Sequence, residues 1–385
     1  MDYPIRILHI VSIMNRGGLE TFIMNTYRNI DRKKVQFDFL VNREESGVYD
    51  DEIQRLGGRI YNIPHIQKVG YKRHKKIFRD FLIEHNNYKT IHSHVNELSG
   101  IYLREAKKIG IPVRISHSHN TKSCNKFNLK GILKLILRKY SKSMIIHSAT
   151  DYFACSNAAA NWLYGKAITN EKSIIVKNGI DTQKFTYDAK IRLKKRLELG
   201  AEDKTFLIGN VASFTSQKNH IGLIDIFHKT LNKIPYARLC LVGDGDLKDD
   251  IYKEVKKRGI EDKVLFLGLR DDINELMMSF DVFLLPSLYE GLPVVLVEAQ
   301  TTGVNCIVSS SVTNEVDLGL DLVHFIDNSD INMWIDMICK INKKIKKSQN
   351  NRTSDINKIS KIGYDINTTS KLLEDIYTLD KEEKK

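Results

Sequence analysis

Short apolar runs rich in β-branched residues alternate with longer segments of helical character along the whole chain. The clearest strand-like runs of the first half are IRILHIVS, FDFLV, TIHSHV, VRISHSH and DYFACS. Those of the second half are TFLIGNVAS, ARLCLVGDG, KVLFLG, DVFLLPS and NCIVSS. Strands that alternate with helices form βαβ units, whose parallel sheets are covered by helices on both faces. Two such series in one chain predict an α/β protein with two Rossmann-like domains.

The two series are separated by an Asn-Gly pair at residues 178–179, after the strand-like run SIIVKN. Asn-Gly is typical of tight turns, so a domain boundary is expected there. The prediction is an N-terminal domain over residues 1–178 and a C-terminal domain over residues 179–360. Residues 361–385 are predicted to hold one more helix, over GYDINTTSKLLEDIY, and to end in a frayed, charged tail.

The chain has 60 Lys and Arg residues against 47 Asp and Glu residues, which gives a net charge of +13. That excess favours an anionic partner: membrane lipid, a polyphosphate ligand or nucleic acid. Five cysteines without paired spacing argue against a disulfide framework or a zinc site. No apolar run reaches the length of a transmembrane helix, and the N-terminus does not read as a signal peptide. These features favour a protein of the reducing cytoplasm.

The richest chemistry lies in the stretch LLPSLYEGLPVVLVEAQ, residues 284–300. An apolar run ends in a Pro-Ser turn, Glu290 follows beside Gly291, Pro293 opens a helix, and Glu298 comes eight residues after the first glutamate. Backbone N–H groups and the positive end of a helix suit an anionic group. The two carboxylates can accept hydrogen bonds from ligand hydroxyls. A phosphate together with many hydroxyls describes a sugar nucleotide, whereas the alternative is two surface glutamates that stabilise a helix end.

This stretch resembles the E-x7-E signature of family 4 retaining glycosyltransferases of the GT-B fold, and is most similar to their bacterial exopolysaccharide and capsule branch. The further motifs that match the family in order are HIVSIMNRGGLETF, FACSNAAANWLYG, VKNGIDTQKF, SQKNHIGLIDIF, LVGDGDLKDDI and FLGLRDDINELM. The resemblance implies two Rossmann-like domains whose parallel sheets face a central cleft. It implies an acceptor side in the N-terminal domain, a nucleotide-sugar side in the C-terminal domain, and a last helix that crosses back to the N-terminal domain.

The resemblance also implies roles for residues spread along the chain. The loop that contains Gly17 and Gly18 is expected to face the donor diphosphate, and Lys218 to neutralise the leaving diphosphate. Glu290 is expected to lie against the donor sugar hydroxyls, and Glu298 to accept hydrogen bonds from the ribose.

The remaining donor contacts implied by the resemblance are made by backbone. Gly291 and Leu292 are expected to meet phosphate or sugar, while turns at Gly243 and Leu269 line the nucleobase pocket. Uridine is the commonest donor nucleoside of this branch. Each of these turns is otherwise an ordinary βα connection.

One position departs from the family pattern. The family usually carries an arginine five residues before the lysine, and the two clamp the diphosphate, but this chain has Ser213 there. A serine donates one hydrogen bond and supplies no charge or bidentate fork. Ser213 is retained as a donor contact, and the departure raises the alternative of a degenerate protein that binds nucleotide or a membrane with little turnover.

Four histidines, His92, His94, His117 and His119, lie where two strand-like runs end, at the edge where parallel sheets bind ligands. The His-x-His spacing invites a metal hypothesis, but no third ligand has convincing spacing, so no metal is predicted. The resemblance implies one histidine close to the donor sugar. His119, followed by Asn120, fits best, and His117 stays open. His119 is grouped with Glu290 and Lys218 as catalytic, and His94, His117 and Asn120 as acceptor or sugar contacts.

A basic segment runs from residue 121 to residue 144. Lys126, Lys130, Lys134, Arg138 and Lys142 recur at every fourth position, which places them on one slanting stripe of a helix. Such a segment suits an anionic membrane surface or a lipid-diphosphate acceptor. A helix with one packed and one solvated face is an equally good interpretation.

Taken together, these features predict a retaining hexosyl- or N-acetylhexosaminyltransferase. It would move a sugar from a nucleotide-sugar, UDP-linked above all, to a glycan or lipid-linked acceptor in surface polysaccharide synthesis, without a metal cofactor. It would act in the cytoplasm, at the periphery of the membrane. A glycosidase that uses Glu290 and Glu298 as its two carboxylates is disfavoured, because the diphosphate-type loops would then have no function. An NAD-dependent oxidoreductase lacks a G-x-G-x-x-G after the first strand, and no nucleic-acid-binding motif is present.

Overall fold

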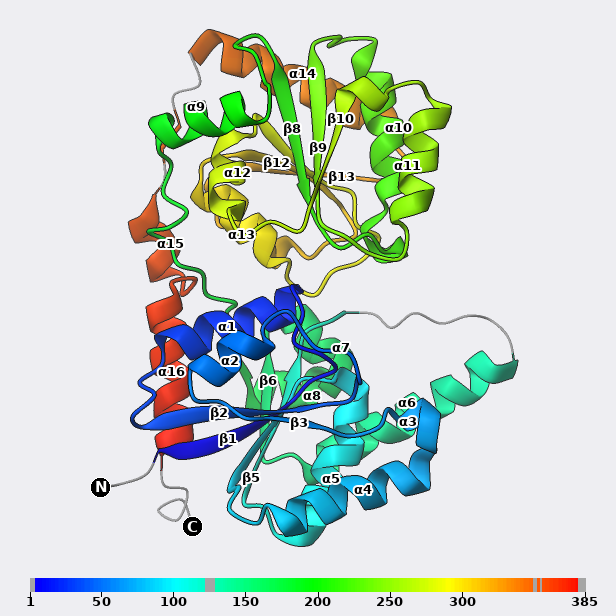
Figure 1. The fold of residues 1–385 in the computed structure, drawn as a ribbon, viewed down its shortest axis with the longest axis vertical. Helices are drawn as coiled ribbons and strands as arrows, with labels where there is room; N and C mark the ends of the chain where they lie inside the picture. The colour runs from blue at the N-terminus through cyan, green and yellow to red at the C-terminus, as the bar shows by residue number, and fades with distance from the viewer. Residues whose placement is uncertain (1–3, 122–128, 349–351, 354, 380–385) are drawn as a thin grey trace. The chain divides into compact units, whose positions relative to one another are not determined.

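The computed structural model describes residues 4–121, 129–348, 352–353 and 355–379, with only the backbone described over residues 129–136. Contacts divide the chain into two compact units (Figure 1). The first unit joins Met1–Gly179 to Asp365–Lys385, and the second is Ile180–Tyr364. The last helix therefore belongs to the first unit, which the chain re-enters at Asp365.

The first unit is built on a seven-stranded sheet in the order β3-β2-β1-β4-β5-β6-β7, in which every recorded pair is parallel. The strands are β1 (Ile5–Ile10), β2 (Val35–Val41), β3 (Ile60–Asn62), β4 (Thr90–Ser93), β5 (Val113–Ser118), β6 (Asp151–Ala154) and β7 (Ser173–Ile175). Parallel strands need crossover connections, and helices supply them here.

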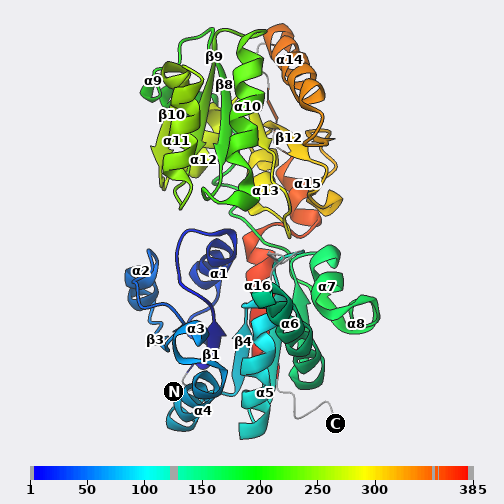
Figure 2. The same cartoon turned by 90° about the vertical axis from the view of Figure 1, so that its right-hand side faces the viewer.

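The helices of the first unit are α1 (Gly18–Asn29), α2 (Asp50–Arg55), α3 (Ile66–Val69), α4 (Tyr71–Glu84), α5 (Ser99–Ile109), α6 (Leu129–Ser148), α7 (Asn157–Tyr164), α8 (Lys166–Lys172) and α16 (Ile366–Thr378), with one 3-10 turn, η1 (Asn96–Leu98). Helices α1 and α16 pack together over β1 and β2 on one face, and α4, α5 and α6 cover the other face (Figures 1 and 2). Each face encloses its own apolar core.

The second unit is built on a six-stranded parallel sheet in the order β10-β9-β8-β11-β12-β13. The strands are β8 (Phe206–Val211), β9 (Ala237–Val242), β10 (Val264–Gly268), β11 (Val282–Leu285), β12 (Asn305–Ser309) and β13 (Val323–Ile326). The α-helices are α9 (Ala189–Glu198), α10 (His220–Leu231), α11 (Lys248–Lys257), α12 (Ile273–Ser279), α13 (Val294–Thr301), α14 (Ile331–Ser348) and α15 (Ile356–Lys361). The 3-10 turns are η2 (Ser216–Lys218), η3 (Glu261–Lys263) and η4 (Asn314–Val316).

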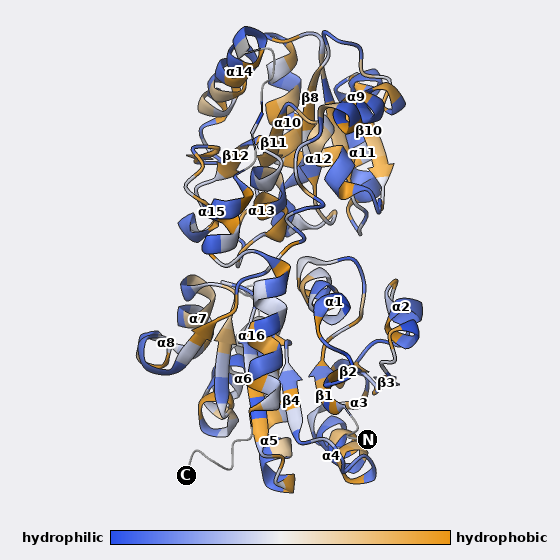
Figure 3. Cartoon of the chain, turned by 90° about the vertical axis from the view of Figure 1, so that its left-hand side faces the viewer, coloured by the Kyte–Doolittle hydropathy of each residue, from blue (hydrophilic) through white to orange (hydrophobic). Residues whose placement is uncertain are grey.

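Coloured by hydropathy, the ribbon shows many hydrophobic residues along the strands, while the helices carry both hydrophobic and hydrophilic residues (Figure 3). In the second unit, Phe227 of α10 and Trp334 of α14 are fully buried against β8, β9 and β11. Sheets covered on both faces need strands that are apolar on both faces, which explains the near-continuous apolar runs in the sequence. No helix in the described part of the chain is long and apolar enough to cross a membrane. The predicted α/β class with two Rossmann-like domains is confirmed.

Both sheets have one point where the strand order reverses. It lies between β1 and β4 in the first sheet and between β8 and β11 in the second. Ligands of such sheets bind outside the carboxyl ends of the strands at this point. The loops that leave these four strands are therefore where functional side chains are expected.

Candidate active site

The loops that follow β8 and β11 meet at the reversal point of the second sheet. Lys218 ends η2, and its Nζ lies 2.6 Å from Oε1 of Glu290 in the loop before α13. Gln217 donates from Nε2 to the carbonyl of Tyr289 at 2.9 Å and to Oε2 of Glu290 at 3.3 Å. The lysine and glutamate side chains are 18% and 7% exposed, so the ion pair is largely shielded from water. The structure thus joins two residues that the sequence predicted for catalysis.

The geometry of this pair depends on Asn219. Its backbone is left-handed, with φ of 54°, and its side chain accepts a hydrogen bond from the Gly222 N–H to cap α10. The same side chain donates from Nδ2 to the carbonyl of Pro286 at 3.1 Å, and the Leu288 N–H donates to the carbonyl of Gln217 at 2.8 Å. Asparagine tolerates this conformation better than most residues. These cross-links hold the two loops as one frame before any ligand binds.

Glu298 lies eight residues after Glu290, in the helix that follows the loop. Pro293 precedes α13, which starts at Val294, so Glu298 belongs to the interior of that helix. The side chain is half-buried, and burial raises the pKa of its carboxyl to about 7, while the charge of Lys184 acts in the opposite direction. Within the described residues the carboxylate has no hydrogen-bond partner. It therefore has open acceptor capacity, which a ligand hydroxyl could use.

Gly291 and Leu292, which follow Glu290 in the loop before Pro293, are buried. Gly243 ends β9 with φ of +140°, and a Cβ on it would meet the carbonyl oxygen of Ala212 at 2.0 Å. Its N–H donates to the carbonyl of Gly268 at 2.9 Å, which places the turn before Leu269 beside it. Leu269 is 50% exposed. The predicted nucleobase turns are thus neighbours, and only glycine fits the first of them.

Ser213 is exposed in the loop that follows β8. Its carbonyl accepts a hydrogen bond from the Thr215 N–H at 2.8 Å, which makes a tight turn, and the adjacent Phe214 is buried. The side chain thus has room for a longer residue, and the position carries no charge of its own.

A cavity of about 560 Å³ lies at the opposite end of this sheet, near the amino ends of β8 and β11. Arg192 and Arg196 line it, and both pair with Asp281, at 2.6 Å and 3.1 Å. No residue predicted for the site lines this cavity. Its charges are used for packing, so we assign the chemistry to the loops at the carboxyl end.

In the first unit, the loop after β1 carries Gly17 and Gly18 at the start of α1. A Cβ on Gly17 would meet the Glu20 carboxylate at 2.2 Å, whereas a Cβ on Gly18 would meet nothing within 4 Å. Burial raises the pKa of the Glu20 carboxyl to about 7. No role was predicted for Glu20 from the sequence, although it lies in the matching motif, two residues after Gly18.

The predicted histidines come together on one face of the first sheet. His94 Nδ1 lies 3.0 Å from His119 Nε2, and His92 Nε2 lies 3.1 Å from His117 Nδ1. The backbone N–H of His119 donates to Oδ1 of Asn96, and Asn120 follows, half-buried, at the sheet edge. Burial lowers the pKa of His119 to about 3, and it lowers the pKa of the other three as well. Burial therefore favours the neutral form of all four imidazoles.

The sequence argument that these histidines lack a third partner is wrong. His9 of β1 pairs in register with His92 of β4, and its Nδ1 lies 3.0 Å from Nε2 of His94. Ligand nitrogens of His9, His92 and His94, and likewise of His94, His117 and His119, lie within 4.8 Å of one another. The available signal was a polar residue inside the apolar run IRILHIVS, in the strand that lies next to the one that carries His92.

The basic stripe is only partly visible. Lys126 lies outside the described residues, and Lys130 and Lys134 lie on α6, where only the backbone is described. Arg138 has its Nε 3.9 Å from Oε1 of Glu97, and Lys142 stacks over the ring of Trp162. These last two are therefore not simply solvated cations, as a uniform stripe would predict.

Comparison with known proteins agrees with the two-domain fold. Residues 16–184 match the model for Glycosyltransferase Family 4, and residues 192–352 match that for Glycosyl transferases group 1. The chain is 39% identical over 337 residues to EpsF of Bacillus subtilis (strain 168), whose name assigns it to the glycosyltransferases, with 87% of each chain covered.

Two further likenesses cover most of the chain. The UDP-Gal:alpha-D-GlcNAc-diphosphoundecaprenol alpha-1,3-galactosyltransferase of Escherichia coli is 27% identical over 356 residues, with 88% of each covered. The crystal structure of Anabaena HepE in complex with UDP and glucose superposes with a TM-score of 0.76 at 18% identity, and covers 97% of this chain and all of that one. The structural likeness concerns the fold.

Proposed function

Because the chain belongs to the GT-B glycosyltransferases that join a family 4 domain to a group 1 domain, we propose that it transfers a hexosyl or N-acetylhexosaminyl group from a UDP-sugar with retention of configuration. The uridine donor is supported by the E. coli relative, whose name specifies UDP-Gal, and by HepE, which was solved with UDP. UDP-Gal and UDP are ligands of those two proteins, and for this chain they only guide the choice of the proposed donor.

The observation that carries the proposal is the ion pair between Lys218 and Glu290. Each side chain satisfies the other while no ligand is bound. When a nucleotide-sugar arrives, the ammonium turns to the diphosphate, and the carboxylate accepts hydrogen bonds from the sugar hydroxyls. As the glycosidic bond breaks, negative charge grows on the leaving diphosphate, and a preorganised cation stabilises it. This role needs no metal at the diphosphate.

Other residues complete the donor site in this proposal. The Glu298 carboxylate accepts hydrogen bonds from the ribose, and it is available because none of the described residues bonds to it. Backbone at Gly291 and Leu292 meets phosphate or sugar, and the turns at Gly243 and Leu269 hold the base. Gly17 and Gly18, at the start of α1, are proposed to meet the diphosphate.

On the acceptor side, we assign a glycan or lipid-linked substrate in surface polysaccharide synthesis. The E. coli relative is named for a diphosphoundecaprenol acceptor, which supports this class. Helix α6 exposes Leu137 and Tyr140, at 53% and 51%, next to the basic positions 130 and 134. Apolar and basic groups on one helix suit an anionic membrane surface, where such an acceptor resides. His119 and Asn120, with His94 or His117 nearby, are proposed sugar contacts.

The first test is thermal stabilisation by UDP, GDP, ADP and NAD. A ligand at a hundredfold excess over its Kd adds about 2.7 kcal/mol of stability, which a melting curve resolves easily. We expect UDP to raise the melting temperature of the parent protein, and we expect Glu298→Ala to lose most of that increase. Glu261→Ala, which changes a carboxylate of η3 on the same unit, is the matched control and should behave as the parent. No shift with any nucleotide would overturn the donor assignment.

A second candidate function is nucleotide binding with little turnover, and Ser213 is the observation that favours it. Transfer from radiolabelled UDP-sugars to membrane lipid extracts separates the two. A UDP-dependent thermal shift without transfer or donor hydrolysis would support the binding protein. Product formation, with the anomeric configuration read by NMR, would support the enzyme and test retention.

A further inference from the structure

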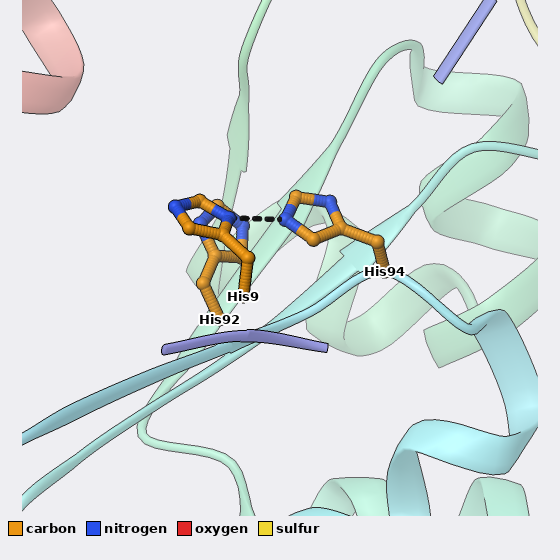
Figure 4. Close-up of side chains that lie close together, drawn as sticks. All are labelled: His9, His92 and His94. Atoms are coloured by element: carbon orange, nitrogen blue, oxygen red, sulfur yellow. Dashed lines mark hydrogen bonds between the residues drawn. The ribbon is translucent and has the colours of Figure 1, made fainter. Parts of the chain in front are cut away.

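Five histidines of the first unit share one face of the sheet at its reversal point. His9 comes from β1, His92 and His94 from β4 and the residue after it, and His117 and His119 from β5 and the residue after it. Four of the five are at most 2% exposed, and His119 is half-buried at the strand end. Figure 4 shows the rings of His9 and His92 side by side, with His94 directed at His9. No role in sugar transfer requires five imidazoles in one place.

The hydrogen bonds among these rings show which ring nitrogens already have a partner. His94 Nε2 is paired with His9 Nδ1 at 3.0 Å, and His117 Nδ1 with His92 Nε2 at 3.1 Å. His92 is anchored in turn, because its Nδ1 lies 2.7 Å from the hydroxyl of Tyr377 on α16. Neither Nδ1 of His94 nor Nε2 of His117 takes part in these pairings. Nδ1 of His94 instead lies 3.0 Å from Nε2 of His119.

One of the remaining nitrogens is unexplained by the protein alone. Nε2 of His117 is fully buried and has no hydrogen-bond partner among the described residues. Buried polar atoms are normally satisfied, because an unpaired one costs roughly 1–3 kcal/mol. The ligand nitrogens of His94, His117 and His119 lie within 4.8 Å of one another. Nitrogens bound at about 2.0–2.1 Å to a tetrahedral ion stand about 3.4 Å apart, so nitrogens this close together can bind one shared metal ion.

We propose that His94, His117 and His119 bind a divalent transition-metal ion of the Zn²⁺ class. An all-imidazole set suits Zn²⁺, Co²⁺, Ni²⁺ or Cu²⁺ rather than Mg²⁺ or Ca²⁺, which prefer oxygen ligands. Three histidines leave a fourth position open, and the half-buried His119 gives the ion a way in. This site belongs to the first unit and is separate from the diphosphate chemistry assigned to Lys218. With the ion bound, the three histidines act as its ligands, so of the sugar contacts proposed above only Asn120 keeps that role unchanged.

The surrounding residues already form the outer shell that such a site needs. A ligating histidine normally turns its other N–H to a hydrogen-bond acceptor, which sets the tautomer and orientation of the ring. His9 does this for His94, and His92 does it for His117. Phe22 packs its edge against the ring of His117 at 5.5 Å between centroids and closes the apolar side. Binding requires Nε2 of His119 to be free of its proton, which Nδ1 of the same ring can hold instead.

The test uses the full chain, produced without a polyhistidine tag, stripped with a chelator and dialysed. Titration with Zn²⁺ should show one bound equivalent by calorimetry and a raised melting temperature. Replacement by Co²⁺ should give the visible absorption bands of a nitrogen-ligated ion, which reports imidazole coordination in the parent protein without any substitution. Elemental analysis after gel filtration should find the ion retained.

Two variants locate the site. His119→Asn should weaken Zn²⁺ binding more than about 100-fold, since losing even an outer-shell partner typically costs 10–100-fold. His147→Asn, which changes an exposed histidine of α6 in the same unit, should bind as the parent does. The metal-free melting temperature of each variant checks that it has folded.

Two results would overturn the proposal. One is the absence of Zn²⁺ binding and of Co²⁺ bands in the parent, which would leave the five rings as a hydrogen-bonded chain only. The other is equal binding by His119→Asn and the parent, which would place the ion elsewhere. Because none of these readouts depends on nucleotide or turnover, they are independent of the donor assignment.

Discussion

The ammonium of Lys218 lies 2.6 Å from the carboxylate of Glu290, although 72 residues separate them in the chain. The contact arises because β8 and β11 are neighbours in the second sheet, so the loops at their carboxyl ends converge. In our proposal the pair is the resting form of a diphosphate and sugar site.

Lys218→Ala should lower the turnover number by about 10²–10³-fold, the range seen when one preorganised stabilising group is removed. Lys218→Arg should recover part of the loss because it keeps the charge. Steady-state kinetics with UDP-sugar measures both. Lys229→Ala removes a lysine that pairs with Asp225 on the exposed face of α10, and it should leave turnover unchanged.

A double-mutant cycle of Lys218→Ala and Glu290→Ala tests the exchange of partners. Contacting residues typically couple by 0.5–3 kcal/mol. We expect such coupling in unfolding experiments without nucleotide, and a smaller value with saturating UDP, because Lys218 then pairs with phosphate. Coupling that stays the same with UDP would mean that the pair is structural.

Glu298 predicts a pH dependence of stability. Its carboxyl has a pKa of about 7 in the folded protein, raised from the usual value of 4.5 by burial. Between these two values the folded state holds the proton while the unfolded state releases it, so the free energy of unfolding falls as pH rises from about 4.5 to about 7. Glu298→Gln should therefore be more stable than the parent at about pH 8, and the advantage should vanish below about pH 4.5.

Urea unfolding at the two pH values measures this difference. Glu261→Gln is the control and should show no pH-dependent gain. A Glu298→Gln curve parallel to that of the parent at every pH would contradict the buried, partnerless carboxyl.

Ser213→Arg should improve catalysis. The exposed serine leaves room for an arginine, which can bind a phosphate through a bidentate fork. A tenfold rise in kcat/KM, which is about 1.4 kcal/mol of transition-state stabilisation, is the expected scale. Ser216→Arg, at another exposed serine of the same loop, is the matched control. Equal kinetics for Ser213→Arg and the parent would show that this position does not reach the diphosphate.

Gly18→Ala tests whether Gly18 is needed for ligand binding rather than for the stability of the fold. A Cβ on Gly18 meets nothing within 4 Å, and alanine favours a helix by roughly 0.5–1 kcal/mol over glycine. We expect an unchanged or higher melting temperature together with weaker UDP-sugar binding. Gly243→Ala should instead lower the melting temperature, since its Cβ would collide with the carbonyl of Ala212.

Reversing the charges of Lys130 and Lys134 on α6 should weaken binding to anionic vesicles at low salt at least tenfold, since each basic residue near such a surface contributes about 1 kcal/mol. Vesicle sedimentation measures this, and added salt should weaken the parent too. The control reverses Lys190 and Lys194, two exposed lysines at the same spacing on α9. If the parent protein does not bind anionic vesicles at low salt, the membrane hypothesis is wrong.

Much of the fold could be predicted because its signals are local. Alternating apolar runs and helical segments predicted two parallel-sheet domains, and the structure confirms them. The start of α13 follows from Pro293 in the same way, because proline favours a helix start. His9 was missed because nothing within its own strand links it to a histidine 85 residues later.

The sequence by itself determined the class of the fold, the places where strands give way to helices, and the kinds of side chain at those places. Periodicity and turn chemistry act over a few residues, so they can be read without coordinates. Only the tertiary structure decided which of these side chains meet. Strand order and register set the contacts of Lys218 with Glu290, of His9 with His94, and of His92 with Tyr377, which lies 285 residues away. Burial then shifted the pKa of Glu298 and of the histidines, because desolvation depends on what packs around a group rather than on its neighbours in sequence.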